Sequence, residues 1–372
     1  MGGSGSTKAA MVEAAPCAAM VLVEGSIIAL TIMASTAMAR GMSPFVFVVY
    51  TNILGSIILL PYCFFYERER SEEAILTFKF LVRVFLLGFI GITIAQNLAY
   101  VGLSYSSPIV ACGMANQIPA FSFILGIILR TIKFNWKSSG SQARVLGTLI
   151  SFAGAILVTL YRGPTIKNHS FPSLSFSASA VAPPRLFVFL APHENWVLGC
   201  ILFAASSFTL AIWNIVQVGT VKMCPNIMKI ISFYSLFGTM QSAAVALFLE
   251  RNPSAWRLDL NFELLVIVLT AIFSSLIRTK VLIWCTRWKG PYFVPAFKPF
   301  GIPYASTFGC LLFADTFHFG SMLGAFVCGV GYYTVLWGEV KDGETQRLDD
   351  RRSDSSTAEK VPLLQDRDDC EV

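Results

Sequence analysis

Long apolar stretches, separated by short polar segments, fill most of this chain. A helix needs about 20 apolar residues to cross a hydrocarbon layer about 30 Å thick, and ten stretches approach that length. Continuous runs of this kind predict α-helices, because a membrane β-barrel would give short segments of alternating hydrophobicity instead. The ten predicted membrane-spanning helices are Cys17–Ala39, Pro44–Phe65, Phe80–Leu103, Pro108–Leu129, Val145–Tyr161, Val197–Val218, Ile227–Leu249, Leu264–Trp284, Pro291–Phe313 and Phe319–Trp337.

The composition also favours an all-α integral membrane protein. Of the 372 residues, 55% are hydrophobic and 13% are charged, and the mean hydropathy is +0.64. A soluble protein of this size carries more charged surface. The nine cysteines are scattered and form no CxxC pair. We therefore predict neither a disulfide framework nor a metal site, and no cofactor.

The distribution of charge predicts the orientation in the bilayer. An even number of spans places both termini on one side, where the loops hold ten Lys and Arg residues against six in the opposite loops. Because cytoplasmic loops carry the excess of Lys and Arg, both termini are predicted to be cytoplasmic. The net charge of +6 fits loops that face anionic lipid better than a nucleic-acid surface.

Three segments differ from the apolar spans. Residues 1–16 begin with MGGSGS and are interpreted as a flexible N-terminal segment or an added tag. Residues 162–195 are rich in Ser and Pro and predict an extracytoplasmic linker, whereas the charged residues 339–372 predict a disordered cytoplasmic tail. The tail contains EKVPLL (359–364), which is similar to an acidic dileucine sorting signal, so the plasma membrane and the vacuolar membrane both remain open as locations.

The linker divides the chain into two five-helix halves, residues 17–161 and 196–338. Because five is odd, the second half enters the membrane in the opposite orientation, and the halves are predicted to form an inverted repeat. Corresponding spans end in related sequences, LVTLYRG in the fifth and YYTVLWG in the tenth. Inverted repeats are typical of secondary transporters, whose substrate lies near the midplane between the halves.

Five segments in both halves resemble a known family. They are GMSPFVFVVYTN (41–52), AYVGLSYSSPIVACGMANQIPAFSF (99–123), GTLISFAGAILVTLYRGP (147–164), KGPYFVPAFKP (289–299) and ADTFHFGSMLGAFVCGVGYYTVLWG (314–338). Together they resemble the plant drug/metabolite transporter (EamA-like) superfamily, and more closely its nodulin-like, Walls-Are-Thin-related group, the UMAMIT transporters. The resemblance implies ten helices, cytoplasmic termini and amino-acid substrates, with auxin in at least one branch. Asp315 stands where that family often has Glu, which keeps the charge.

Polar side chains within the spans are the candidate substrate-binding residues, because hydrocarbon offers them no partner. Asn116, Gln117 and Pro119 lie near the middle of the fourth predicted span. Pro119 removes a backbone donor and leaves the carbonyl of Ala115 without its helical partner. A loosened turn beside two amides could therefore meet a polar substrate. The alternative is a hydrogen bond between helices that stabilises the bundle.

Charged residues complete the predicted site. Lys298 lies between two prolines in the ninth predicted span, close to the repeat counterpart of Asn116, and is predicted to bind a substrate carboxylate; the alternative is an ion pair within the bundle. Glu24 could bind a substrate ammonium, carry a coupling proton, or pair with Lys298. Arg278 and Lys280 are either buried or, as we predict, mark the cytoplasmic end of a short span. Further candidates are Asn97, Gln96, Asn214, Gln217 and Trp213.

These observations predict an alternating-access transporter of a small polar metabolite, with an amino acid as the first expectation. Auxin or another indole or organic acid is the alternative, and protons and a second copy of the chain remain open as partners. A membrane receptor is a further alternative, which the repeat disfavours. An enzyme is not expected, because the three histidines, His169, His193 and His318, lie in predicted loops or at span ends and no catalytic motif accompanies them.

Overall fold

A computed structural model describes residues 3–66, 78–131, 136, 138–161, 196–221, 227–258, 261–312 and 319–358. The predicted linker at 162–195, Asp315, the three histidines and the EKVPLL segment lie outside these ranges. The regular structure within them is helical throughout. The elements are α1 (Gly3–Ala39), α2 (Pro44–Tyr66), α3 (Phe78–Gly88), η2 (Phe89–Gln96), α4 (Asn97–Tyr105), α5 (Pro108–Ala115), α6 (Ile118–Ile128), α7 (Ser139–Leu160), α8 (Trp196–Val221), α9 (Ile227–Leu249), η3 (Pro253–Trp256), α10 (Phe262–Ile272), η4 (Phe273–Arg278), α11 (Thr279–Lys289), α12 (Phe293–Ala296), η5 (Lys298–Phe300), α13 (Gly301–Leu312) and α14 (Phe319–Ala358).

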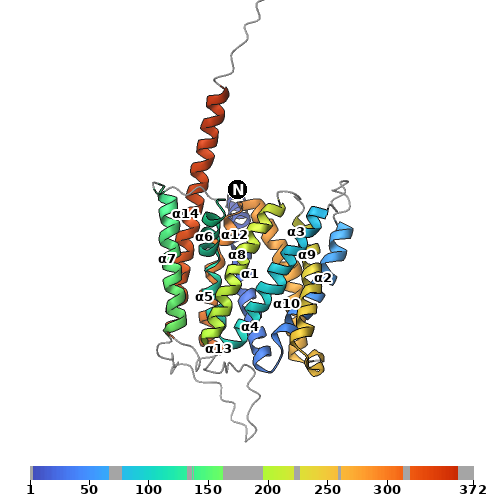
Figure 1. Cartoon of the computed structure of the whole chain (residues 1–372). Helices are drawn as coiled ribbons and strands as arrows, with labels where there is room; N and C mark the ends of the chain where they lie inside the picture. The colour runs from blue at the N-terminus through green and yellow to red at the C-terminus, as the bar shows by residue number, and fades with distance from the viewer. Residues whose placement is uncertain are drawn as a thin grey trace, which may run out of the picture.

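The predicted all-helical membrane bundle is confirmed. Nine helical stretches in the described part of the chain are long and apolar enough to cross a membrane. The remaining predicted span is broken into α12, η5 and α13, and Figure 1 places α12 and α13 toward opposite ends of the bundle. The N-terminus lies at the end from which α14 projects, as an even number of crossings requires (Figure 1).

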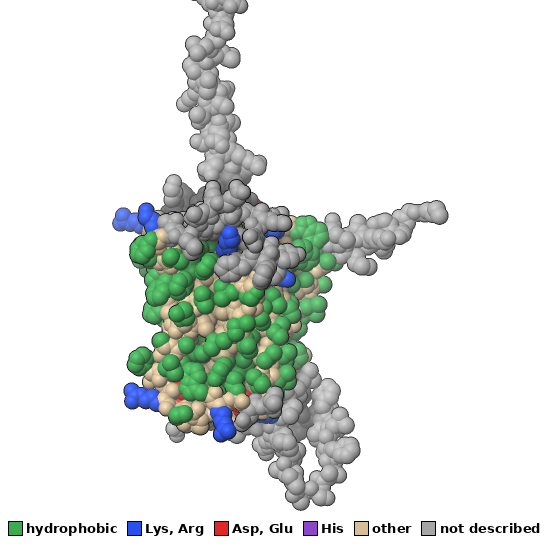
Figure 2. Space-filling model, turned by 90° about the vertical axis from the view of Figure 1, so that its right-hand side faces the viewer, with side chains coloured by type: hydrophobic (Ala, Val, Ile, Leu, Met, Phe, Trp, Pro, Cys, Tyr) green, Lys and Arg blue, Asp and Glu red, His purple; other side chains and the backbone are tan. Residues whose placement is uncertain are grey.

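The outer surface is suited to lipid. Large apolar side chains point outward on several helices, among them Leu22 at 70%, Leu160 at 75% and Phe248 at 76% exposure. Figure 2 shows this apolar surface as a band, with Lys and Arg side chains gathered toward its two ends. Water would disfavour such a surface, whereas a bilayer with charged head groups on both sides matches it.

The two halves pack about each other in matching ways. Helix α2 packs on α9, α7 on α14, and α5 on α13, and each pair joins corresponding spans of the two halves. Helix α1 packs on α10 and α11 in the same way that α8 packs on α3 and α4. The third span of each half contains a π-helical segment, η2 or η4, and the fourth span of each half is broken. These shared contacts and defects agree with an inverted repeat.

Proline accounts for both broken spans. In the fourth span, Pro119 follows the break between α5 and α6, where Asn116 and Gln117 lie. In the ninth span, Pro295 lies within α12 and Pro299 within η5. Each proline lacks the N–H that a continuous helix would use, so the chain changes helix type at these points. Both breaks occur well inside the bundle rather than at its surface.

Helices α7 and α14 are held together by glycines that recur every seven residues. They are Gly140, Gly147 and Gly154 on α7, opposite Gly338, Gly331 and Gly324 on α14. A Cβ atom at Gly147 would lie 2.7 Å from the backbone nitrogen of Val335 and 2.8 Å from the carbonyl oxygen of Gly331. The two backbones are therefore in direct contact, as small residues permit within membranes. This contact makes α14 part of the rigid scaffold of the bundle.

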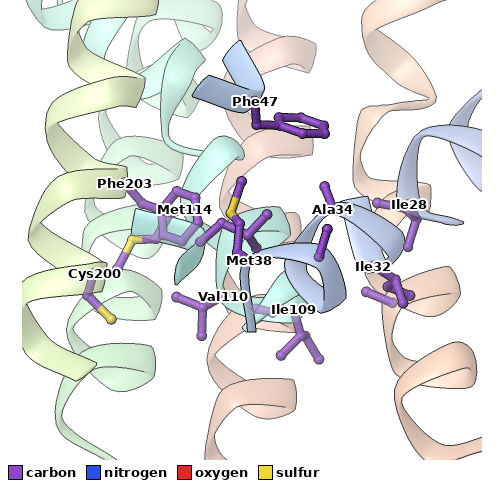
Figure 3. Packing of buried hydrophobic residues seen from close by; sticks show 14 of the residues in the cluster. Ile28, Ile32, Ala34, Met38, Phe47, Ile109, Val110, Met114, Cys200 and Phe203 are labelled. Carbon is purple, nitrogen blue, oxygen red and sulfur yellow. The ribbon is translucent and has the colours of Figure 1, made fainter. Parts of the chain in front are cut away.

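One apolar core links the two halves. It contains buried side chains from α1, α2, α5, α8, α13 and α14. Figure 3 shows Met38, Phe47, Met114 and Phe203 converging between their helices. The core and the α7–α14 contact together fix the positions of the broken spans.

The structure corrects the expected ends of the chain. Helix α14 continues to Ala358, so residues 339–358 are helical where we expected a disordered tail. Asp342 anchors the first turns of this extension through Arg144 and Ser138, and the following Glu, Gln, Arg and Leu residues favour helix. Helix α1 likewise begins at Gly3, because the Ala-rich segment before Cys17 extends the helix. Helix α7 begins at Ser139 rather than Val145.

We expect Gly147→Leu to disrupt the α7–α14 contact, because the new side chain would occupy the space of the α14 backbone. The cost should be at least about 2 kcal/mol, the size typical of overpacking. Thermal unfolding of detergent-purified protein measures it. Ala153→Leu is the matched control, since Ala153 lies on the exposed side of the same helix. Equal unfolding temperatures for the two variants would contradict the close contact.

Candidate functional site

An ion pair lies inside the bundle between α1 and the broken ninth span. The Lys298 Nζ atom donates to Glu24 Oε1 at 2.7 Å. Glu24 is buried, with 4% of its side chain exposed, whereas 35% of the Lys298 side chain is exposed. Lys298 is nevertheless within electrostatic reach of Cys112 on α5 and Arg278 on η4, besides Glu24. The Lys298 side chain thus combines a buried carboxylate partner with a one-third exposed surface of its own.

The pair lies near the middle of the membrane. Glu24 is ten residues from the start of its span at Ala14, which corresponds to about 15 Å of helix. Lys298 is eight residues beyond Gly290, the turn residue with a φ of 95°, which gives about 12 Å. These depths are close to half of a hydrocarbon layer of about 30 Å. An ion pair was the alternative that the sequence suggested for both residues.

Arg278 is a partly buried cation that the sequence prediction misplaced. It ends η4, and the helix continues for eleven residues to Lys289, so it lies about 16 Å from that end rather than at a cytoplasmic boundary. Its Nε atom is buried and has no hydrogen-bond partner among the described residues. Tyr100 on α4 and Tyr234 on α9 lie within electrostatic reach of its guanidinium. Apolar residues on both sides of Arg278 in the sequence are the signal that could have identified it.

Asn116 and Gln117 have different environments at the break of the fourth span. Gln117 donates from Nε2 to the carbonyl oxygen of Ser151 at 2.8 Å and to Cys328 Sγ at 3.2 Å, so it joins the broken span to α7 and α14. This is the helix–helix hydrogen bond considered as the alternative. The Asn116 side chain is 3% exposed, and its Nδ2 atom has no partner among the described residues. Asn116 therefore keeps an unused donor in the interior.

Gln96 and Asn97 belong to a polar network around η2. Asn97 donates from Nδ2 to the carbonyl oxygen of Thr93 at 2.9 Å and to Ser242 Oγ at 3.0 Å. Gln96 accepts from Asn52 Nδ2 at 3.0 Å. A π-helical turn disturbs the regular backbone bonding, and the Asn97 amide compensates for it. Both residues join helices, and they do not contact the Glu24–Lys298 pair.

Of the three candidates on α8, Trp213 contacts a tyrosine. The Trp213 ring meets the Tyr234 ring edge-on, with centroids 5.8 Å apart. It fits there because Gly91 has no side chain, since a Cβ atom would lie 2.6 Å from Trp213 Nε1. Asn214 and Gln217 are partly exposed. The structure therefore brings Trp213 close to the Tyr234–Arg278 region, whereas Gln117, Gln96 and Asn97 serve contacts between helices.

An apolar groove lies apart from these charges. It has a volume of about 280 Å³ and is lined by residues of α5, α6, α7 and α8, including Gln117, Phe121 and Phe152. Leu160 and Ile201 at its edge are among the outward-facing side chains. The groove opens on the lipid-facing surface, so we place the candidate site at the charged interior instead.

Comparison with known proteins agrees with this architecture. The profile of the EamA-like transporter family matches residues 15–160, which coincide with the first five spans. The WAT1-related protein At1g70260 of Arabidopsis thaliana is 48% identical over 369 residues, covering 97% of this chain and 98% of that protein. The chain belongs to the WAT1-related (Walls Are Thin) family. The Arabidopsis protein WALLS ARE THIN 1 is 32% identical to this WAT1-related chain, covering 89% of this chain and 86% of that protein.

The fold of this WAT1-related protein also occurs among solved structures. One, described only as "Crystal structure of protein", superposes with a TM-score of 0.50 over 85% of this chain and 96% of that chain, at 14% identity. At that identity the likeness concerns the fold alone. Family membership makes the chain a multi-pass membrane transporter of the drug/metabolite superfamily, and it points to a transporter rather than an enzyme.

We expect Lys298→Met to destabilise this WAT1-related protein, because it leaves the Glu24 carboxylate buried without a partner. Breaking a fully buried pair costs about 3–5 kcal/mol, and the cost here should be smaller because Lys298 is partly accessible. The double variant Glu24→Gln/Lys298→Met should recover much of the loss. Thermal unfolding in detergent compares the three proteins. A double variant less stable than Lys298→Met would contradict the pairing.

Gln117→Met should lower stability by about 1–3 kcal/mol, because the carbonyl of Ser151 loses its buried donor. Gln217→Met is the matched control, since Gln217 is partly exposed on α8. The same unfolding measurement separates the two variants. If Gln217→Met were the more damaging change, the assignment of Gln117 to helix packing would be wrong.

Proposed function

We propose that this chain transports small carboxylate-bearing metabolites by alternating access between its two halves, with amino acids as the first substrate class. The observation that carries the proposal is the Glu24–Lys298 pair, in which two opposite charges lie 2.7 Å apart near the midplane. An amino acid presents the same two charges. Its ammonium can replace Lys298 beside Glu24 while its carboxylate binds the cation that is released.

The exchange of partners would couple substrate binding to movement of two segments of the bundle. Glu24 belongs to α1, whereas Lys298 belongs to the broken ninth span. A substrate inserted between Glu24 and Lys298 replaces the ion pair that connects these two segments. Its charges then influence the relative position of the segments. Binding energy that differs between two arrangements is the requirement for a ligand to shift their populations. Asn116, at the corresponding break of the first half, would orient the solute through its unused donor.

An indole or organic acid such as auxin is the second candidate. Tyr100 and Tyr234 lie within electrostatic reach of Arg278, and Trp213 packs on Tyr234; aromatic side chains near a cation favour a flat carboxylate. The carboxylate of such a solute would bind the cations, and the solute would require no contact with Glu24. The two candidates therefore differ in their dependence on Glu24.

Orientation and coupling are part of the proposal. The excess of Lys and Arg in the loops on the terminal side supports cytoplasmic termini, in the plasma membrane or the vacuolar membrane. We propose Glu24 as the residue that carries a coupling proton, because it loses its ionic partner when Lys298 moves away from it. A substrate-driven exchange therefore allows proton coupling without a further acidic residue.

The test is uptake into proteoliposomes that contain purified protein. A panel of amino acids and indole acids is offered with and without a pH gradient. Lys298→Ala should lower uptake at least about tenfold while the protein remains folded, since a charge-assisted contact is lost. Glu24→Gln should abolish amino-acid uptake and leave indole-acid uptake nearly unchanged. Unchanged uptake by Lys298→Ala would remove Lys298 from the site.

A further inference from the structure

Two adjacent tyrosines on α14 hold the break of the ninth span. The Tyr332 hydroxyl donates to the carbonyl oxygen of Pro295 at 2.8 Å, and the Tyr333 hydroxyl donates to that of Ala296 at 2.9 Å. Both carbonyls belong to the end of α12, directly before Lys298. The turn that carries Lys298 is therefore connected to α14 by two hydrogen bonds.

The prolines explain why these carbonyls need a donor from another helix. In a continuous helix the Pro295 carbonyl would accept from the backbone N–H of residue 299, which is a proline and has none. The Ala296 carbonyl would accept from Phe300, whose N–H donates instead to Phe297 at 3.1 Å. Hydrocarbon offers no replacement. The two hydroxyl groups supply the missing donors only while the break stays beside α14.

The tyrosines themselves belong to a rigid part of the protein. Tyr332 is buried, whereas 41% of Tyr333 is exposed on the outer side of the bundle. The two rings meet edge-on, with centroids 6.1 Å apart. Helix α14 is fixed in turn by the glycine contact with α7. The hydrogen bonds therefore connect the turn of Lys298 to the scaffold and not to another movable segment.

The first half connects its broken span in the opposite sense. The related span ends LVTLYRG and YYTVLWG align Leu157 and Val158 of α7 with the two tyrosines, so α7 has no hydroxyl groups there. Instead Gln117, at the break of the fourth span, donates to the carbonyl oxygen of Ser151 on α7. In the second half the scaffold supplies the side chains, and Lys298 is left to bind Glu24.

Helix α1, which carries Glu24, is held by less directional contacts. Three of its hydroxyl groups donate to carbonyl oxygens of α1 itself, those of Ser26, Thr31 and Thr36. Met20 makes apolar contacts with α11 and α12. Gly25 faces the ring of Tyr304, which a Cβ atom would approach to 3.1 Å, so no side chain interlocks there. Hydrogen bonds restrict geometry more narrowly than such contacts do.

We propose that Tyr332 and Tyr333 are positioning residues that keep Lys298 on the scaffold, and that α1 with Glu24 moves when a substrate separates the ion pair. This inference rests on the proposed transport function and identifies the moving part of its site. A substrate carboxylate then meets a cation at a fixed place, while the substrate ammonium accompanies Glu24.

The experiment removes single hydroxyl groups and keeps the rings. The variants are Tyr332→Phe, Tyr333→Phe and the double variant. Tyr50→Phe is the matched control, because Tyr50 on α2 also donates to a backbone carbonyl at 2.8 Å, that of Trp256 in η3. Hydrogen–deuterium exchange is measured on detergent-purified full-length protein with and without glutamine or indole-3-acetate. Uptake of the same two solutes into proteoliposomes gives KM and the maximal rate.

We expect the double variant to exchange faster at residues 293–301, because the break loses its donors. Its KM should rise about three- to tenfold, since Lys298 occupies the binding position for less of the time, while the maximal rate changes less. Tyr50→Phe should alter neither quantity. In the wild type the solutes should change exchange at residues 18–28 and leave residues 293–301 unchanged. If the double variant does not fold, Tyr332→Phe alone carries the test.

Three results would overturn the inference. They are unchanged exchange at residues 293–301 in the tyrosine variants, an equal rise of KM in Tyr50→Phe, and a solute effect on residues 293–301 without one on α1. Faster exchange at the break in a protein that takes up neither solute would support the anchoring and refute transport of these solutes. Uptake with a KM that the tyrosines do not affect would support transport and refute the positioning role.

Discussion

Hydrocarbon supplies neither hydrogen bonds nor counter-charges, and this constraint decides where every polar group of the bundle can lie. Backbone groups satisfy it through helices, and a broken helix satisfies it only within protein or beside a solvent-filled space. The breaks at Asn116 and at Lys298 therefore occur inside the bundle, where side chains from other spans surround them. Charges obey the same rule more strictly, which explains why the Lys298 ammonium and the Glu24 carboxylate meet at 2.7 Å.

The two halves share the same arrangement of helices, but they differ in the side chains at equivalent helix crossings. Where α8 crosses the fourth span, Ser207 donates to the carbonyl oxygen of Met114 at 2.8 Å, a neutral contact next to the break. Where α1 crosses the ninth span, the Glu24–Lys298 ion pair occupies the corresponding place. Inverted symmetry supplies equivalent positions at the midplane, and substitutions in one half then give the site its charge. A symmetric backbone can in this way hold an asymmetric solute.

Much of this fold follows from the sequence, because the bilayer makes hydrophobic length a direct signal of helices. The helix Ile227–Leu249 was predicted to the residue, and Pro119 predicted the loosened turn of the fourth span. The ninth span was predicted as one continuous helix, and the structure shows it broken. The rotation of each helix is not encoded in that signal. Neighbouring residues point about 100° apart, so the sequence could not tell that Gln117 joins helices while Asn116 keeps a free donor. Arg278 was misplaced for a related reason, since a charge in an apolar run also marks a helix end.

The alternating access that we propose requires that some helix contacts persist while others change, and the packing of this protein separates the two kinds. The backbones of α7 and α14 touch along three pairs of glycines. Asp342 fixes the end of that contact nearest the extension of α14, because it accepts from Ser138 at 2.6 Å and lies 3.7 Å from Arg144. Such a contact has no room to slide. The crossings at the broken spans rest instead on a few polar contacts, such as the Glu24–Lys298 pair and the Ser207–Met114 hydrogen bond. Movement is therefore cheapest where the charges lie, which is where a substrate can act on it.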